Sequence, residues 1–339
     1  MWGTTGNAYD PDRTAGGSSG GAGSALALRM LPVADGSDFM GSLRNPAAFN
    51  NVLGFRPSWG RVPESGFIAT PAVVGPMAHT AADLAALLSV MAGPDAGAPL
   101  AVDGDSSAFT RSLQRNFRGT RIAWVGDWNG HLATEPGLLD LCETSFAAFE
   151  SIGCGVDSAL PSYDPDKIWD TFLTWRWWGN AGAGYDYYTD PARRKLLKPE
   201  AVWEIERGLE LSGLDVSRAA AARTDLYAAV QKLFETYDFI LAPSAQVFPF
   251  GKKVHWPTEI AGRAMDTYHR WMETAACWSL TGLPALGMPV GFSRQGLPMG
   301  VQLIGKHHAD LAVLQLAHAY EQATGWVAKR PPSLITSAH

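Results

Sequence analysis

The sequence predicts an α/β fold in which short buried strands alternate with helices. Residues 120–125 (TRIAWV) and 239–241 (FIL) have the length and apolar composition of buried strands. Helical patterns over residues 138–152 and 219–237 lie next to them in the chain. Because strands that alternate with helices usually form a helix-covered sheet, we expect a mixed central sheet covered by helices.

The first part of the chain alternates loops with short regular elements. A glycine and serine cluster in residues 14–31 passes into an Ala/Leu run, which predicts a tight loop that opens a helix. Residues 31–34 form a short apolar run, residues 35–41 have a turn-like composition, and residues 50–58 indicate a strand and loop ended by Pro57.

A helix is predicted from the segment TAADLAALLSVMAG. Thr80 can cap its first turn, Asp83 favours that turn, and Gly93 ends the apolar face. Near the C-terminus, ALGMPVGF and LPMGVQLIG predict two strands around a turn at residues 293–296, and residues 309–324 predict a helix.

Residues 160–235 depart from this alternation, because their helical patterns are rich in Trp and Tyr. We interpret them as a helical insertion within one domain that spans residues 1–339. Buried packing and a pocket wall both account for such an aromatic cluster, so the residues alone leave both alternatives open.

Composition and charge argue against several classes of partner. The chain has 339 residues, with 27 Lys plus Arg, 33 Asp plus Glu and a net charge of −6, and neither sign gathers into a long run. Nucleic acid and anionic membranes are therefore not expected partners. The apolar residues 25–31 are interrupted by Arg29 and are too short to span a membrane.

Cellular location follows from the cysteines and the first residues. The three cysteines have neither an even number nor the spacing of metal ligands, which fits a reducing cytoplasm. The first residues do not join a basic segment to an apolar stretch, so no secretory signal is expected. We expect a cytoplasmic protein.

Two serine motifs carry the functional signal. Ser18 lies in TAGGSSGGAGSALAL, and Ser42 lies 24 residues later in ADGSDFMGSLRNPAAFNNVLGFRPS. In wording and spacing the two segments resemble the amidase signature family of serine hydrolases. The resemblance continues through GFRPSWGRVP, GPMAHTAADLAALLSVMAG, CWSLTGLPALGMPVGF and GLPMGVQLIG, and it is weakest over residues 160–235.

The resemblance implies a mechanism and a set of site residues. Ser42 would be the nucleophile, and Ser18, preceded by a cis peptide bond, would pass its proton to an unprotonated lysine. Backbone N–H groups of Phe39, Met40 and Gly41 would form the oxyanion hole. The implied reaction is hydrolysis of a small-molecule amide by water through an acyl-enzyme, without cofactor or metal.

The charged residues that flank Ser42 have a different expected role. Neither Asp38 nor Arg44 is suited to act as a base at neutral pH. We expect them to form a buried charged scaffold that fixes the loop. The sequence leaves the oligomeric state open, a homo-oligomer included.

The family lysine is absent from this stretch of sequence. It is expected many tens of residues before the glycine and serine loop, yet no lysine precedes Lys167. The sequence is therefore interpreted as an amidase signature domain without its N-terminal portion, and residues 1–339 alone are expected to show little activity. Two alternatives stay open: a glutamine-hydrolysing subunit of a tRNA-dependent amidotransferase, and a non-catalytic remnant of the fold.

Other interpretations of the same motifs fit less well. Gly-x-Ser-x-Gly occurs around Ser18 and again around Ser19, but a nucleophile elbow needs a buried strand before it, and DPDRTA is polar. No Gly-Lys-Ser/Thr follows the glycines, so a phosphate loop is excluded. A lone histidine before a helix, as at His79, is usually structural, and the adjacent His307 and His308 are expected to be solvated.

Overall fold

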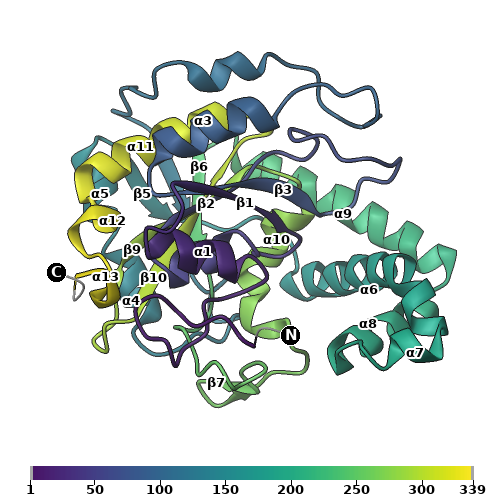
Figure 1. The fold of residues 1–339 in the computed structure, drawn as a ribbon. Coiled ribbons are helices and arrows are strands. Elements are labelled where there is room, and N and C mark those ends of the chain that lie inside the picture. The colour runs from purple at the N-terminus through teal and green to yellow at the C-terminus, as the bar shows by residue number, and fades with distance from the viewer. Residues whose placement is uncertain (1–2, 337–339) are drawn as a thin grey trace. The chain divides into compact units, whose positions relative to one another are not determined.

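The computed structural model describes residues 3–336, which contain an eight-stranded mixed sheet with helices on both faces (Figure 1). The predicted α/β class is thus confirmed. The strand order is β1-β3-β2-β9-β10-β6-β4-β5. Neighbours pair antiparallel from β1 to β6, whereas β6, β4 and β5 run parallel. The strands are β1 (Val33–Asp38), β2 (Leu53–Arg56), β3 (Val73–Ala78), β4 (Arg121–Trp124), β5 (Gly155–Ser158), β6 (Phe239–Pro243), β9 (Ala285–Phe292) and β10 (Pro298–Gly305), with a separate pair β7 (Glu259–Ile260) and β8 (Arg263–Ala264).

The helices follow the strands in most of the predicted places. They are α1 (Gly20–Ala27), α2 (Arg44–Phe49), α3 (Ala81–Met91), α4 (Leu138–Glu143), α5 (Phe146–Ser151), α6 (Pro165–Thr189), α7 (Pro191–Arg194), α8 (Pro199–Leu209), α9 (Gly213–Leu233), α10 (Ala276–Leu280), α11 (Asp310–Thr324), α12 (Trp326–Lys329) and α13 (Ser333–Thr336), with 3-10 turns η1 (Ser106–Thr110) and η2 (Arg270–Ala275).

The turn expected over residues 35–41 was wrong for its first part, because strand β1 extends to Asp38. The strand continues to Asp38 because it pairs antiparallel with β3, from Val33 opposite Ala78 to Asp38 opposite Val73. It lies at the edge of the sheet and exposes Asp35 and Ser37. Polar composition is compatible with an edge strand whose alternate side chains face water.

The helix expected over residues 138–152 is broken into α4 and α5. At the break, the hydroxyl of Thr144 donates to Leu141 O and the hydroxyl of Ser145 donates to Cys142 O, each at 2.7 Å. Such back-bonding hydroxyls compete with the helical hydrogen-bond pattern. The apolar periodicity crosses the break unchanged, so it could not reveal the interruption.

Helix α9 also begins earlier than the expected residue 219. The Ser212 hydroxyl accepts the Asp215 N–H at 3.2 Å, and the Asp215 carboxylate accepts the Ser212 N–H at 2.9 Å. This reciprocal cap fixes the helix start at Gly213.

Helices α2 and α11 lie on opposite faces of the sheet. A Cβ on Gly300 of β10 would lie 3.0 Å from Ala48 of α2, and one on Gly305 would lie 2.4 Å from Val313 of α11. Side chains of a strand alternate between faces, and these two positions differ by an odd number of residues.

Glycines on the sheet let the start of α2 approach it closely. On β2 and β9, Gly54 and Gly287 pair with each other, and a Cβ at either would collide with the backbone of Leu43 or Arg44. Glycine at both positions lets the start of α2 approach the sheet directly. This close approach places the loop that carries Ser42 over the sheet.

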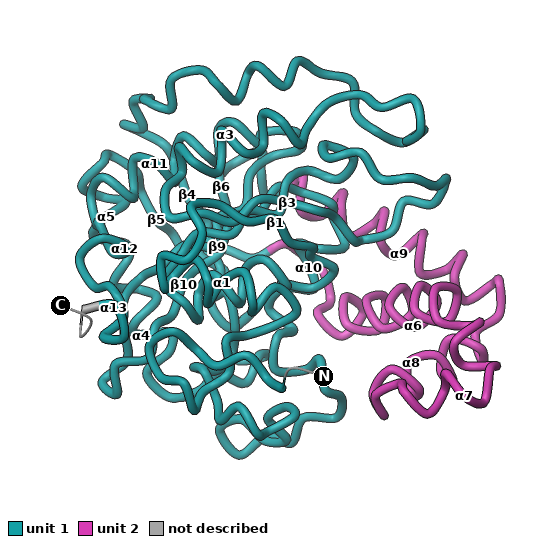
Figure 2. Tube along the Cα trace, viewed as in Figure 1, with its two compact units in different colours: residues 1–160, 233–339 teal, residues 161–232 magenta. Residues whose placement is uncertain are grey.

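Residues 161–232, within the range interpreted as a helical insertion, form a second compact unit; the first comprises residues 1–160 and 233–339 (Figure 2). Trp177 of α6 and Trp203 of α8 meet edge to face at 5.7 Å. The buried Glu204 of α8 accepts hydrogen bonds from Arg176 and Asn180 of α6. No helix among residues 3–336 combines the length and apolar character needed to cross a bilayer.

Candidate active site

Ser42 lies in the short turn that joins β1 to α2. Gly41 directly before it has φ +86°, a left-handed conformation that glycine adopts readily. A Cβ on Gly41 would also lie 3.1 Å from the Ala275 Cβ, so a larger residue would crowd η2. Ser42 itself is partly exposed, while its neighbours Gly41 and Leu43 are buried.

One carboxylate organises this turn. Asp38, fully buried, accepts the Gly41 N–H at 2.7 Å and the Leu43 N–H at 3.2 Å. It also forms a two-point ion pair with Arg44, in which both N···O distances are 2.9 Å. The expected Asp38 and Arg44 scaffold is therefore present, and it holds the residues on both sides of Ser42.

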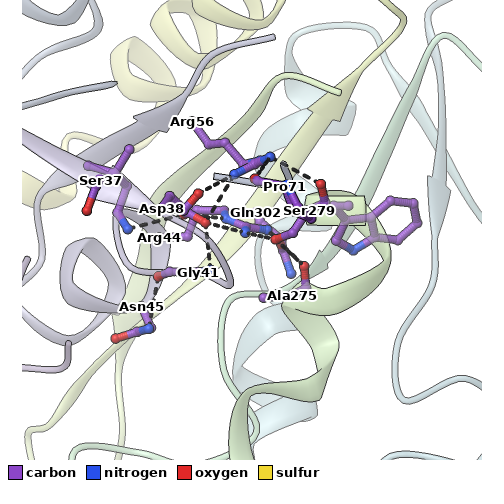
Figure 3. Close-up of polar contacts among 12 residues, drawn as sticks. Ser37, Asp38, Gly41, Arg44, Asn45, Arg56, Pro71, Ala275, Ser279 and Gln302 are labelled. Carbon is purple, nitrogen blue, oxygen red and sulfur yellow. Dashed lines mark hydrogen bonds and ion pairs between the residues drawn. The ribbon is translucent and has the colours of Figure 1, made fainter. Parts of the chain in front are cut away.

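The scaffold extends beyond the residues predicted from sequence (Figure 3). Arg56 donates to the backbone carbonyl of Asp38 and, at 2.6 Å, to that of Pro71. Arg44 donates to Gln302 and, at 2.7 Å, to the Ser279 hydroxyl. Strands β2 and β10 and helix α10 thereby share in fixing the turn.

The charges in this network determine the state of Asp38. Burial alone would raise the pKa of Asp38, but the charges of Arg44 and Arg56 outweigh that effect and hold the pKa well below its usual value. Asp38 is consequently ionised at neutral pH. It cannot serve as a proton acceptor for Ser42 while it is paired with two guanidinium groups.

The Ser18 loop precedes α1 and contains the expected cis peptide bond, between Gly17 and Ser18. The loop lies against the Ser42 turn, because the Ser19 N–H donates to Ser42 O at 3.3 Å. Ser18 is exposed. The structure thus brings together two serine-bearing segments that are 24 residues apart in the chain.

Asn45 also joins the two segments, and its role was not predicted from the sequence. Its side-chain oxygen accepts the Gly17 N–H at 3.0 Å. Its Nδ2 donates to Gly17 O and to Gly41 O, each at 2.9 Å. A single asparagine has no distinctive spacing, so only its contacts could reveal this role.

Two of the predicted oxyanion donors, Met40 and Gly41, differ in whether their N–H groups are already hydrogen-bonded. The Gly41 N–H already donates to the Asp38 carboxylate. The Met40 N–H has no acceptor within residues 3–336, and the same holds for the N–H of Ser42 itself. Unpaired N–H groups next to a candidate nucleophile are the kind of donor that an oxyanion requires.

Neither Ser18 Oγ nor Ser42 Oγ has a hydrogen-bond partner within the described residues, so no basic side chain there hydrogen-bonds to either serine. His79 lies elsewhere, with its Nε2 2.6 Å from Leu26 O at the end of α1. His307 and His308 are exposed, and their rings stack at 3.8 Å. No group of three or more His, Cys, Asp or Glu side chains in residues 3–336 is arranged to hold a metal.

Comparison with known proteins identifies the family. The amidase family model matches residues 1–314. The chain belongs to the amidase signature family. It is 29% identical over 345 residues to an acylamidase from Rhodococcus erythropolis, and the match covers 100% of this chain and 71% of that protein. A glutamyl-tRNA(Gln) amidotransferase subunit from Ralstonia nicotianae is 31% identical, with 96% of this chain and 72% of that subunit covered.

Solved structures of the family agree with this assignment. A bacterial aryl acylamidase of the amidase signature family superimposes with a TM-score of 0.87 at 27% identity, and the match covers 98% of this chain and 71% of the other. The mixed sheet with its helices is therefore the amidase signature fold. As a member of this family, the protein is an amide-hydrolysing enzyme.

Proposed function

We propose that the protein hydrolyses a carboxylic acid amide through an acyl-enzyme on Ser42, with Ser18 as the proton shuttle. The observation that carries the proposal is the hydrogen bond from Ser19 N–H to Ser42 O, which holds the Ser18 loop beside the turn with Ser42. The likeness to an acylamidase supports an acyl amide as the substrate.

The reaction proceeds in two stages. Ser42 Oγ attacks the amide carbonyl while its proton passes to Ser18 and the proton of Ser18 passes to a base. Collapse of the tetrahedral intermediate expels the amine, which takes up a proton as it leaves. Water then attacks the acyl-enzyme by the same route, releases the carboxylic acid and restores Ser42.

In this proposal the base is a lysine that is not among residues 1–339, as the family resemblance implies. The match of both serine motifs to the family supports this assignment. Serine hydroxyls remain protonated at neutral pH, so the relay needs a group that can accept the proton. Cytoplasmic location and action on a free small molecule remain part of the proposal.

The oxyanion hole in this proposal consists of the N–H groups of Phe39, Met40 and Gly41. The free N–H of Met40 supports its share. The Gly41 N–H must turn partly from Asp38 toward the oxyanion, or contribute through its aligned dipole. Loss of one such donor typically costs about 3–4 kcal/mol of transition-state stabilisation.

Labelling of the full gene product with a fluorophosphonate tests the nucleophile. We expect labelling at Ser42 that is abolished by Ser42→Ala and retained in Ser37→Ala, a control at an exposed position on the preceding strand. Labelling that survives Ser42→Ala would contradict the assignment.

Kinetics test the shuttle. Ser18→Ala should lower kcat far more than it raises KM, because a proton relay acts chiefly in the transition state. An unchanged kcat would remove Ser18 from the mechanism.

The alternative is a glutamine-hydrolysing amidotransferase subunit, and the 31% identity to such a subunit favours it. The two functions differ in substrate. A free enzyme should hydrolyse acyl amides by itself, whereas an amidotransferase subunit should release ammonia from glutamine and depend on a partner. An intact fold in the full gene product with neither activity would instead indicate a non-catalytic remnant.

A further inference from the structure

We infer that Asn45 is a positioning residue that sets Ser18 and Ser42 relative to each other. The inference rests on the proposed function for its kinetic consequence, but its geometric content is independent of it. Asn45 is fully buried in the first turn of α2, three residues after Ser42.

The hydrogen bonds of Asn45 reach the peptide groups directly before both serines. The two carbonyl oxygens that accept its Nδ2 hydrogens belong to Gly17 and Gly41, the residues that precede Ser18 and Ser42. Its Oδ1 accepts the N–H of the same Gly17. One planar amide therefore fixes both sides of Gly17 and links them to the peptide bond that leads into Ser42.

The fit around Asn45 is close. A Cβ on Gly16 would lie 2.6 Å from the Asn45 Oδ1, so glycine is required for the loop to approach the amide. Gly41 O also accepts the backbone N–H of Asn45 at 2.7 Å. Gly41 O thus accepts hydrogen bonds from both the backbone and the side chain of Asn45, whereas Gly17 is bound, among residues 3–336, only by the Asn45 side chain.

Only an amide supplies this combination of one acceptor and two donors in the space of asparagine. Asn45→Asp keeps the shape and the acceptor but removes both donors, and it places a carboxylate against two carbonyl oxygens. The Ser18 loop should then lose the bond from residue 45 to Gly17 O, while the bond from Gly17 N–H to residue 45 faces a carboxylate that is repelled by the two carbonyl oxygens.

Asn50 provides a matched control at the other end of the same helix. It is equally buried, and its Nδ2 donates to Ala15 O at 2.8 Å and to Pro46 O at 2.9 Å, while its Oδ1 accepts the Ala8 N–H at 3.2 Å. Asn50→Asp therefore removes the same number of donors from the same kind of environment without touching the peptides before Ser18 and Ser42.

The kinetic test compares the two variants in the full gene product. We expect Asn45→Asp to lower kcat for an acyl amide by about 10- to 100-fold more than Asn50→Asp, with KM changed by less than about threefold, because misplacement of reacting groups acts on the chemical step. Thermal unfolding should show similar losses of stability for both. Equal kcat losses, or a loss confined to KM, would overturn the positioning role.

Hydrogen exchange provides a readout that needs no activity. Asn45→Ala removes the acceptor of the Gly17 N–H and should speed exchange in a peptide covering residues 16–19, whereas Asn50→Ala removes the acceptor of the Ala8 N–H and should speed exchange there. Unchanged exchange over residues 16–19 in Asn45→Ala would refute the link. If the wild-type gene product hydrolyses no amide, the proposed function fails, and the exchange comparison still decides the role of Asn45.

Discussion

At the scale of single residues, Asp38 does the most to shape the candidate site. Its carboxylate accepts from two backbone N–H groups of the Ser42 turn and pairs with two arginines, and all of these residues are buried. Ion pairs of this kind are poor evidence of net stabilisation, because burial of the charges costs about as much as their attraction returns. Their effect on geometry is clearer, since the carboxylate binds the backbone N–H groups on both sides of Ser42.

Removal of the Asp38 charge should be strongly destabilising. Asp38→Asn leaves Arg44 and Arg56 buried without a counter-charge, and we expect the free energy of unfolding to fall by about 3–5 kcal/mol. Asp35→Asn, at an exposed position on the same strand, is the control and should change it by less than about 0.5 kcal/mol. Urea titration at pH 7 measures both, and equal effects would contradict the role given to Asp38.

The same variant should alter acid unfolding. The pKa of Asp38 is lower in the folded protein than in the unfolded chain, so its stabilising contribution is complete above the unfolded value of about 3.9. That contribution is lost as the pH falls below this value toward the folded pKa. Wild type should therefore lose stability below pH 4 more steeply than Asp38→Asn, as measured by urea titrations at successive pH values.

The spacing of residues in the sequence predicted only part of the hydrogen-bond network around Asp38. Asp38 and Arg44 flank Ser42 in the chain, so their pairing could be expected from the motif. Arg56, Ser279 and Gln302 come from distant strands and helices, and no local spacing marks them. Asn45 was missed for another reason: it sits inside the motif, but its partners lie in a different loop.

At the scale of elements, the start of α3 was predicted correctly, whereas the start of α9 and the break between α4 and α5 were missed. The Thr80 hydroxyl accepts the Asp83 N–H at 3.0 Å, as the capping signal predicted, and α3 begins at the next residue. A cap depends on residues three apart, which the sequence displays directly. The break between α4 and α5 depends on the directions in which the Thr144 and Ser145 hydroxyls point, and the sequence does not display these directions.

His79 lies just before α3 and contacts the end of α1. We expect its contribution to stability to depend on pH. Its ring contacts Leu26 O at the end of α1, and burial, opposed by this hydrogen bond, lowers its pKa. The folded state therefore favours the neutral ring, and this contribution to stability is complete above the unfolded pKa of about 6.5. It is lost as the pH falls through the lower folded pKa.

His79→Gln should remove this dependence, because glutamine can donate to Leu26 O without titrating. We expect wild type to lose more stability than the variant between about pH 7 and pH 5. His255→Gln, at an exposed position, serves as the control and should change the pH profile less than His79→Gln does. Parallel pH profiles for wild type and His79→Gln, measured by thermal unfolding, would show that His79 has no such role.

At the scale of the whole molecule, the fold class was predictable and the strand order was not. The alternation of strands and helices is local, so the sequence displayed it. The central pairing of β2 with β9 joins residues more than two hundred positions apart, and β4 pairs with both β5 and β6 across long connections. Such pairings depend on which surfaces fit, as with the glycines beneath α2, and no pattern within one strand encodes its neighbours.

A second long-range link ties the chain after β2 to the start of α11. The buried Asp310 accepts the Ser58 N–H at 2.7 Å and the Ser58 hydroxyl at 2.8 Å, and it pairs with Arg61 at 3.3 Å. These partners lie about 250 residues before it in the chain. The carboxylate is thus shared between two segments that meet only in the folded state.

A double-mutant cycle of Asp310 and Ser58 can measure how much their interaction contributes to the free energy of unfolding. Asp310→Ala should lower the free energy of unfolding by about 3–5 kcal/mol, because it leaves Arg61 and the Ser58 N–H without their partner. Ser58→Ala removes one neutral donor and should cost about 1 kcal/mol. Since the hydroxyl has nothing to bind once the carboxylate is gone, the double variant should be less destabilised than the sum of the two, by about 0.5–3 kcal/mol. Strict additivity in urea titrations would mean that Asp310 acts only as a favourable charge at the N-terminus of α11, an effect of at most about 1 kcal/mol at such a position.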